Sequence, residues 1–469
     1  MTSANSPEES LHRGLSNRNI QLIALGGAIG TGLFMGSGST IHSAGPSIIL
    51  VYLIIGFVLF LIMRAMGEIL IHNLEFKSFQ DFAHHLIGPW AGFITGWTYW
   101  FLWVVIAIGD MIVITGYFDY WIGNMTISAA VTLGLLFTLV LINLLTVRLF
   151  GEVEFWFSLI KIAAIVALIA VGSVMVATGF TGPSGETASF THLWDHGGFF
   201  PTGASGFLGA FSIAIYSFIG TELIGTTAAE AKDPERTIPR AINQVPFRIA
   251  IFYVGALAVI MAITPWDVID PERSPFVSVF AMVGLGAAAS IMNFVVLTSA
   301  ASSANSGIFS SSRMMYGLAQ SHQAPRLFGQ LSSHRVPWHA LLFIGLLILI
   351  YLPILFIGGS VLKGFELIAA VATTLILFIW ALILVSYIRY RKKHRAEHNV
   401  SPFKLHFAAV TPWLALAFIG FISAVLIYFP ATRLPTALTP VWFLTLGVVW
   451  AVRKRILLRR GVPLEIING

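Results

Sequence analysis

The chain has no cysteine and few charged residues. Only 10% of its 469 residues are Asp, Glu, Lys or Arg, whereas a soluble domain carries about 25%. The absence of cysteine excludes a disulfide framework and thiolate metal sites. A soluble fold of this length would need far more polar surface, and 57% of the residues are apolar. The composition therefore predicts a protein that is embedded in a lipid bilayer.

Motifs for nucleotide hydrolysis and for metalloprotease chemistry are also missing. The sequence contains neither a phosphate loop of the GxxxxGK[ST] type nor an HExxH pair. His84 and His85 are adjacent and lack the spacing of metal ligands. An ATP-driven pump is therefore disfavoured. We expect no enzyme activity, no metal and no cofactor.

Long apolar segments dominate what is present. A membrane-spanning helix needs about 20 apolar residues, and only helices satisfy the backbone polar groups of such single segments internally. We therefore predict an all-α polytopic membrane protein with twelve transmembrane helices, surrounded by membrane lipid. The predicted segments are roughly 20–42, 45–72, 90–122, 127–148, 154–178, 205–228, 243–268, 280–306, 338–358, 363–390, 405–430 and 434–456.

Basic residues predict the orientation, because cytoplasmic loops carry an excess of Lys and Arg. They gather in the N-terminal arm 1–19, after the sixth, eighth and tenth segments, and after the last one: Arg13, Arg18, Lys232, Arg236, Arg240, Arg313, Arg326, Arg335, Arg389, Arg391, Lys392, Lys393, Arg395, Arg453, Lys454, Arg455, Arg459 and Arg460. The opposite loops carry only Arg273, Lys363 and Arg433. Both termini, including the tail 457–469, are therefore predicted to be cytoplasmic. The net charge of +6 reflects this topology and not a nucleic-acid partner.

Glycines interrupt two of the apolar segments. The first segment contains Gly26-Gly27-Ala28-Ile29-Gly30-Thr31-Gly32, and the sixth contains Phe218-Ile219-Gly220-Thr221-Glu222. Glycine costs about 1 kcal/mol relative to alanine inside a helix, so unwound backbone or very close packing is expected. Interrupted helices in corresponding halves of a transporter mark its binding site. Their free N–H and C=O groups suit the carboxylate and the ammonium of an amino acid. Packing of small residues of the GxxxG kind is the alternative.

Lys161 lies within the fifth apolar segment. A charged lysine at the centre of a bilayer costs at least about 2.5–3.5 kcal/mol. A lysine that gains and loses its proton there is a candidate proton carrier. The alternative is a side chain that extends to the membrane surface. Arg64 and Glu68, one turn apart in the second segment, are predicted to form a structural ion pair.

Several other polar residues lie at membrane depth. Asp110 in the third segment is either a substrate or proton group, or the partner of a buried polar neighbour. Glu222 either forms hydrogen bonds within the broken helix or relays a proton. Tyr216, one turn before the second break, either covers the substrate or belongs to the core. Ser299, Ser302 and Ser306 follow one another at i, i+3 and i+7 and therefore form a polar stripe along one face of a helix. This stripe either binds substrate or joins helices.

Short motifs in a specific order resemble those of amino acid permeases of the amino acid–polyamine–organocation superfamily, over nearly the whole chain. The matching stretches are 26–34, 66–68, 151–156, 228–230, 305–313 and 324–325. Within this superfamily, the chain is most similar to bacterial permeases for D-serine, D-alanine and glycine. The stretches that carry this closer similarity are 73–79, 225–230 and 294–303.

The resemblance implies a LeuT-like fold, with two five-helix inverted repeats at 20–200 and 201–392 and with helices 11 and 12 at 393–456. It implies that the first break binds the substrate carboxylate, that the second holds the ammonium, and that Lys161 takes the proton. Tyr216 matches a gating aromatic residue. The candidate substrate-binding residues are Ala28, Ile29, Gly30, Thr31, Gly32, Asp110, Tyr216, Ile219, Gly220, Glu222 and Ser302. The candidate proton-coupling residues are Lys161 and Glu222.

Together these features predict a proton-coupled symporter that imports small neutral amino acids such as D-alanine, D-serine and glycine, as well as D-cycloserine. The alternatives within transport are a permease for L-alanine, aromatic amino acids or γ-aminobutyrate, and an exchanger that moves no protons. A receptor that senses amino acids is expected to carry a soluble signalling domain, and a membrane enzyme a catalytic constellation. Neither is recognisable in this sequence.

Overall fold

The computed structural model describes residues 29–74, 76, 78–145, 147–182, 185–223, 233–282 and 286–459. Ten helices in these ranges are long and apolar enough to cross a membrane. Within the same ranges, the only β contact is one isolated bridge between Thr181 and Thr187. The prediction of an all-α membrane protein is therefore confirmed.

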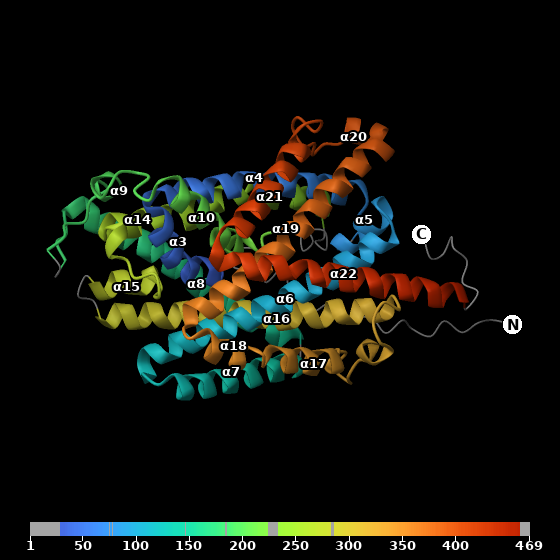
Figure 1. Ribbon diagram of the computed structural model, residues 1–469, viewed down its shortest axis with the longest axis horizontal. Coiled ribbons are helices and arrows are strands. Elements are labelled where there is room, and N and C mark those ends of the chain that lie inside the picture. The colour runs from blue at the N-terminus through green and yellow to red at the C-terminus, as the bar shows by residue number, and fades with distance from the viewer. Residues whose placement is uncertain are drawn as a thin grey trace.

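Figure 1 shows the described helices packed into one bundle. Those before residue 220 are α2 (Thr31–Phe34), α3 (Gly36–Ala44), η1 (Gly45–Ser47), α4 (Ile48–His72), α5 (Phe79–Leu86), α6 (Pro89–Ile122), α7 (Met125–Leu145), α8 (Val147–Thr178), α9 (His192–Asp195), α10 (Gly203–Ala214) and η2 (Ile215–Phe218). Those after it are α12 (Pro234–Asn243), α13 (Val245–Arg248), η3 (Ile249–Gly255), α14 (Ala256–Ile263), η4 (Trp266–Val268), α15 (Pro275–Met282), α16 (Gly286–Gln320), η5 (Arg326–Gly329), α17 (Trp338–Ile348), α18 (Tyr351–Gly358), α19 (Val361–Lys393), α20 (Arg395–Val400), α21 (Thr411–Tyr428) and α22 (Pro430–Arg459).

Local sequence sets the ends of the central helices. Helix α6 begins with Pro89, whose fixed φ suits the first helical position. It ends at Ile122, and the capping residue Gly123 adopts the left-handed conformation with φ of 65°. Helix α19 begins after Ser360, whose hydroxyl accepts the N–H of Lys363 at 3.2 Å. These signals place the ends of two of the central helices.

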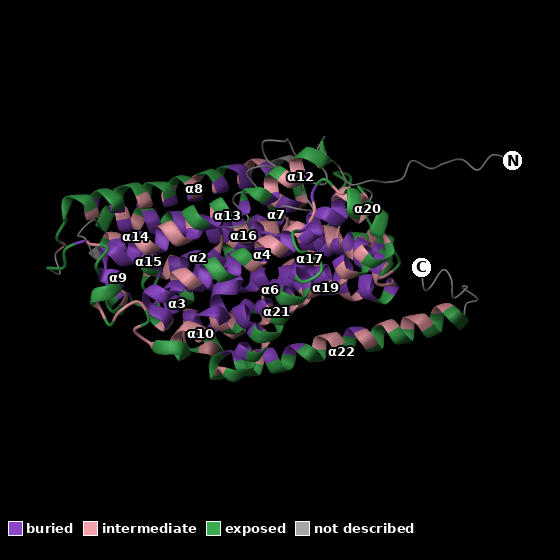
Figure 2. Cartoon of the chain, turned by 90° about the horizontal axis from the view of Figure 1, so that it is seen from above, coloured by how far each residue is buried: buried purple, intermediate pink, exposed green. Residues whose placement is uncertain are grey.

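Helices α6, α16 and α19 form the centre of the bundle, and α6 packs along both of the others. The outer helices α7, α8, α17 and α22 carry large apolar side chains that are exposed in the isolated chain, including Phe137, Val174, Leu346 and Leu444. Figure 2 shows exposed residues along α22, which lies at one edge of the bundle. An apolar outer surface of this kind fits a lipid environment.

The predicted ion pair between Arg64 and Glu68 is wrong. The Glu68 carboxylate is fully buried; it accepts the Tyr387 hydroxyl at 2.7 Å and lies 2.6 Å from Nδ1 of His398. The Arg64 guanidinium instead donates to the Asn243 side chain at 3.1 Å. Tyr387 in α19 and His398 in α20 thus replace Arg64, one helical turn away, as the partners of the Glu68 carboxylate.

Candidate functional site

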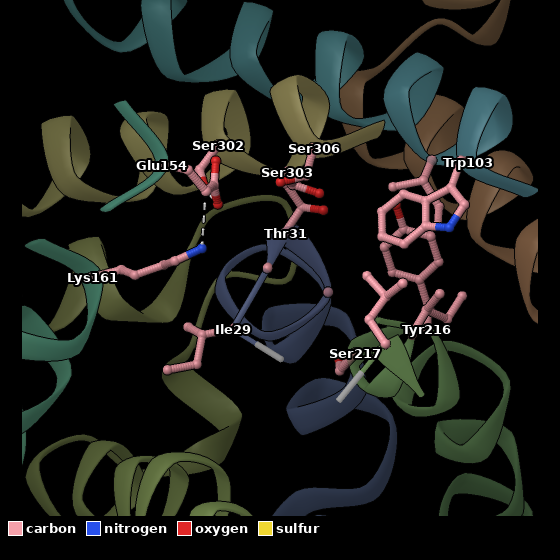
Figure 3. A pocket seen from close by; sticks show the side chains of 15 residues that line it. Ile29, Thr31, Trp103, Glu154, Lys161, Tyr216, Ser217, Ser302, Ser303 and Ser306 are labelled. Carbon is pink, nitrogen blue, oxygen red and sulfur yellow. Dashed lines mark hydrogen bonds between the residues drawn. The ribbon is translucent and has the colours of Figure 1, made fainter. Parts of the chain in front are cut away.

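A cavity lies between α2, α6, α8, α16 and the end of η2 (Figure 3). Its volume is about 40 Å³, which is room for a few water molecules. The residues that line it are Ile29, Gly30, Thr31, Gly32, Trp103, Ile106, Glu154, Lys161, Tyr216, Ser217, Ile219, Leu223, Ser302, Ser303 and Ser306. The wall therefore combines both glycine-interrupted segments with three of the predicted membrane helices.

The first interrupted segment presents a helix N-terminus to the cavity. Gly30 is extended, with φ of −127° and ψ of −167°, and α2 begins at Thr31. The chain continues through Met35, in helical conformation, into α3. The first amides of a helix have no acceptor within it, and its positive dipole end attracts anions. The unwound backbone predicted from the glycines is thus present at Ile29 and Gly30.

The second interrupted segment leaves the helix after η2. Ile219 is extended, with φ of −64° and ψ of 137°. Gly220 follows with φ of +96°, in the region that favours glycine. The Ile219 carbonyl accepts no hydrogen bond from the part of the chain that the structure describes. This carbonyl is therefore available to an ammonium group.

The two interrupted segments meet at Gly32 and Ser217. A Cβ atom added to Gly32 would lie only 2.5 Å from the Ser217 Cα, closer than real atoms approach. Ser217 is itself fixed, because its carbonyl accepts the Tyr253 hydroxyl at 2.8 Å. Its own hydroxyl lies 3.1 Å from the Tyr52 hydroxyl. The contact therefore requires glycine at position 32.

Glu222 stabilises the second break from behind the cavity wall. Its carboxylate accepts the Gly220 N–H at 3.0 Å and the Tyr99 hydroxyl at 3.1 Å, and it is fully buried. The position of Glu222 fits the hydrogen-bonding role expected for it within the broken helix. It is not among the residues that line the cavity.

Lys161 belongs to a buried polar cluster at one side of the cavity. Its amine donates to the Ser302 hydroxyl at 3.2 Å, and that hydroxyl donates to Glu154 at 2.5 Å. Lys161 and Glu154 are each 1% exposed, so the alternative in which the lysine extends to the membrane surface does not hold. Figure 3 shows the three side chains on the side of Thr31 opposite to Trp103 and Tyr216.

Two aromatic residues, each with a polar group that forms no hydrogen bond among the described residues, lie on the other side of the cavity. Among the described residues, neither the Tyr216 hydroxyl nor the Trp103 indole N–H has a hydrogen-bond partner, and both are buried. The Tyr216 ring packs edge-on against Phe365, with centroids 5.2 Å apart. Buried polar groups are nearly always satisfied. These two groups therefore suit the polar parts of a bound molecule.

Asp110 lies directly behind the first break. Its Oδ1 accepts the Thr31 hydroxyl at 2.7 Å, and the carboxylate is fully buried. Its Oδ2 has no hydrogen-bond partner within the described ranges. Asp110 is absent from the cavity lining, so its direct contact is with Thr31 and not with the cavity.

The structure brings most of the predicted site residues to the cavity. Those in its wall are Ile29, Gly30, Thr31, Gly32, Lys161, Tyr216, Ile219 and Ser302. Asp110, Gly220 and Glu222 lie behind the wall, and Ala28 lies outside the described residues. Of the predicted serine stripe, Ser302 and Ser306 reach the cavity, while the Ser299 hydroxyl donates to the Ile29 carbonyl at 3.3 Å.

Sequence reasoning missed several members of the wall, which are Trp103, Ile106, Glu154, Ser217, Leu223 and Ser303. Two of them carried a usable signal. Glu154 lies seven residues before Lys161, so the two side chains share one face of α8. Trp103 lies seven residues before Asp110 and shares a face of α6 with it.

Replacing Glu222 with alanine should destabilise the second break. The change leaves the Gly220 N–H and the Tyr99 hydroxyl buried without this acceptor, and each such loss costs roughly 1–3 kcal/mol. We expect a lower melting temperature of the purified protein, measured by intrinsic fluorescence. Tyr99→Phe is the matched control with the smaller effect, because the carboxylate keeps the Gly220 amide. An unchanged melting temperature in Glu222→Ala would contradict this role.

Comparison with known proteins connects this arrangement to a family. The family model described as amino acid permease matches residues 19–459. The chain is 54% identical to the D-serine/D-alanine/glycine transporter of Escherichia coli strain K12, over 94% of each chain. It is 48% identical to the amino-acid permease AapA of Bacillus subtilis strain 168, over 96% of each chain. It is 40% identical to the aromatic amino acid transport protein AroP of Escherichia coli strain CFT073, over 95% of this chain and 97% of that one.

Proposed function

The chain belongs to the amino acid permease family and is an amino acid transporter, and from this premise we propose that it imports D-alanine, D-serine and glycine together with a proton. The observation that carries the proposal is the meeting of extended backbone at Gly30 and at Ile219 around one small polar cavity beside Lys161. The name of the Escherichia coli relative supports the same substrates. D-cycloserine, a small cyclic zwitterion, is expected to compete with them.

In this proposal, the first break binds the substrate carboxylate. Gly30, Thr31 and Gly32 line the cavity where α2 begins, and the first amides of a helix suit an anion. The hydrogen bond from the Thr31 hydroxyl to Asp110 fixes the orientation of this turn. The bound carboxylate would thus contact backbone groups that need no reorganisation.

The ammonium group would lie at the second break. The Ile219 carbonyl is the acceptor proposed for it, with the Tyr216 hydroxyl as a neighbour and as a gate toward solvent. A small cavity favours a side chain no larger than a methyl or hydroxymethyl group. For this reason we favour D-alanine, D-serine and glycine over the aromatic substrates named for the relative that is 40% identical.

Lys161 is the proposed proton carrier. It is surrounded by the bundle and contacts Ser302, which also contacts Glu154. A buried charge is costly unless it is paired. The nearby Glu154 carboxylate would therefore favour the protonated form of Lys161. Access of water to the cavity would favour it as well. Alternating access of the cavity to the two sides of the membrane would then link proton movement to substrate movement.

The architecture proposed for this cycle has twelve membrane helices, with two inverted five-helix repeats at 20–200 and 201–392 and a pair of helices at 393–456. Both termini would face the cytoplasm, since basic residues concentrate on that side. The end of the bundle that carries α20 would then be cytoplasmic, and the end that carries α9 external.

Uptake of radiolabelled D-alanine by proteoliposomes tests the proposal. With an interior more alkaline than the exterior, we expect accumulation that a protonophore abolishes. Unlabelled D-serine, glycine and D-cycloserine should compete, whereas phenylalanine and γ-aminobutyrate should not. Accumulation that is indifferent to the pH gradient, or competition by phenylalanine alone, would contradict the proposal.

A further inference from the structure

The connection between α8 and α10 holds three metal-ligating side chains far from the cavity. One carboxylate oxygen of Glu186 and one ring nitrogen each of His192 and His196 lie within 4.8 Å of one another. We propose that these residues bind one transition-metal ion of the Zn²⁺ class. The site is separate from the amino acid cavity, since none of its residues lines that cavity.

His192 is buried, and one of its ring nitrogens lacks a hydrogen-bond partner among the described residues. Its side chain is 7% exposed, and its Nδ1 has no hydrogen-bond partner among the described residues. The backbone at His192 is held at the start of α9, because its N–H donates to the Ser189 carbonyl. A buried nitrogen left without a partner costs free energy, and a bound metal ion would satisfy it.

His196 is oriented by a second carboxylate from a different part of the chain. Its Nδ1 lies 3.3 Å from the Asp267 carboxylate in η4, which leaves Nε2 free to bind a metal. The Trp266 indole N–H donates to the His196 carbonyl at 2.9 Å and fixes the backbone. Metal-ligating histidines commonly donate their second N–H to a carboxylate in this manner. Asp267 is therefore a positioning residue of the proposed site.

The donor set selects the kind of metal. Two imidazole nitrogens and one carboxylate match the ligands of Zn²⁺ sites that keep a fourth position for water. Mg²⁺ and Ca²⁺ prefer oxygen ligands only, so they are poor candidates. Zn–N and Zn–O bonds are about 2.0–2.2 Å long, so the ligand atoms of a tetrahedral site are about 3.4 Å apart. The three atoms now lie within 4.8 Å of one another, so they need to approach by up to about 1.4 Å.

The bound ion would join two connections of the bundle. Glu186, His192 and His196 lie between α8 and α10, whereas Asp267 lies between α14 and α15. Figure 1 shows α9 at one end of the molecule, with α5 toward the other. In the orientation proposed above, this end faces the outside, where it is exposed to external Zn²⁺. The ion would therefore hold the α8–α10 connection against η4.

Isothermal titration of the purified full-length protein with ZnCl₂ tests the proposal. The protein must be purified through a tag that contains no histidine. We expect one ion per chain, a melting temperature that rises with Zn²⁺, and reversal by EDTA. His192→Ala and His196→Ala should remove the binding, and Asp267→Asn should weaken it by about 10–100-fold. Glu186→Gln alters only an exposed side chain, so it should fold normally and still bind Zn²⁺ more weakly.

His334→Ala is the matched control, because His334 is an exposed histidine outside the cluster. It should bind Zn²⁺ as the unmodified protein does. Co²⁺ should occupy the same site and give the visible absorption of a low-coordinate nitrogen and oxygen site. His192→Ala should lose this absorption, and Glu186→Gln should need a higher Co²⁺ concentration to reach it. The absence of binding to the unmodified protein, or unchanged stoichiometry and affinity in both His192→Ala and Glu186→Gln, would overturn the proposal.

Discussion

Lys161→Ala should abolish the accumulation of D-alanine that a pH gradient drives, while D-alanine counterflow persists. The reason is that Lys161 is the proposed proton carrier, whereas the groups proposed to bind the substrate belong to the two helix breaks. Without the amine, the transporter could still exchange substrate across the membrane but could not draw on the proton gradient. The measurement compares net uptake and counterflow in the same proteoliposomes.

The expected loss needs a control for folding, because removing Lys161 leaves Glu154 as a buried carboxylate without its nearby cation. Losing one partner of a buried pair destabilises by about 3–5 kcal/mol. The double variant Lys161→Ala/Glu154→Gln removes the unpaired charge as well, so it should regain stability and counterflow without regaining pH-driven uptake. Lys363→Ala, at an exposed position of α19, should leave both activities unchanged. Retention of pH-driven accumulation in Lys161→Ala would exclude the proposed role.

Gly32→Ala should strongly weaken substrate binding. The new methyl group would meet the backbone of Ser217 at 2.5 Å, and no side-chain rotation relieves a clash with backbone. Overpacking costs roughly 1–3 kcal/mol, which corresponds to a loss of about 5–150-fold in an equilibrium constant. We therefore expect the two breaks to separate and D-alanine affinity to fall by about that factor, measured by equilibrium binding to the purified protein.

Gly134→Ala is the matched control for this substitution. A Cβ atom at Gly134, on α7, meets nothing within 4 Å, so D-alanine affinity and melting temperature should stay close to those of the unmodified protein. If Gly32→Ala binds D-alanine as tightly as Gly134→Ala does, close contact between the two breaks does not matter for binding.

The sequence predicts the helices and the breaks because the bilayer leaves few alternatives. A single apolar segment long enough to cross the bilayer must be helical. Clustered glycines within such a segment indicate where the helix is interrupted. Gly30 and Gly220 are accordingly extended or left-handed in the structure. Lys161 was identifiable for the same reason, since an ionisable residue at membrane depth requires a specific environment.

What the sequence could not predict depends on contacts between distant segments. Ser302 and Lys161 are 141 residues apart, and no local pattern indicates that they touch, although the seven-residue spacing of Glu154 and Lys161 places those two side chains on one face of α8. The i, i+4 spacing of Arg64 and Glu68 favoured a pair, but His398, 330 positions beyond Glu68, binds the carboxylate instead. The register of packed helices decides such contacts.

Competition binding with modified substrates tests most directly whether two opposed helix breaks hold a zwitterion. Purified protein is equilibrated with labelled D-alanine and challenged with unlabelled D-alanine, D-alanine methyl ester or N-acetyl-D-alanine. Only unmodified D-alanine should displace the label, because the ester lacks the carboxylate for Gly30–Gly32 and the acetylated compound lacks the ammonium for the Ile219 carbonyl. Equal displacement by the ester or by the acetylated compound would show that the breaks do not bind the two charged ends.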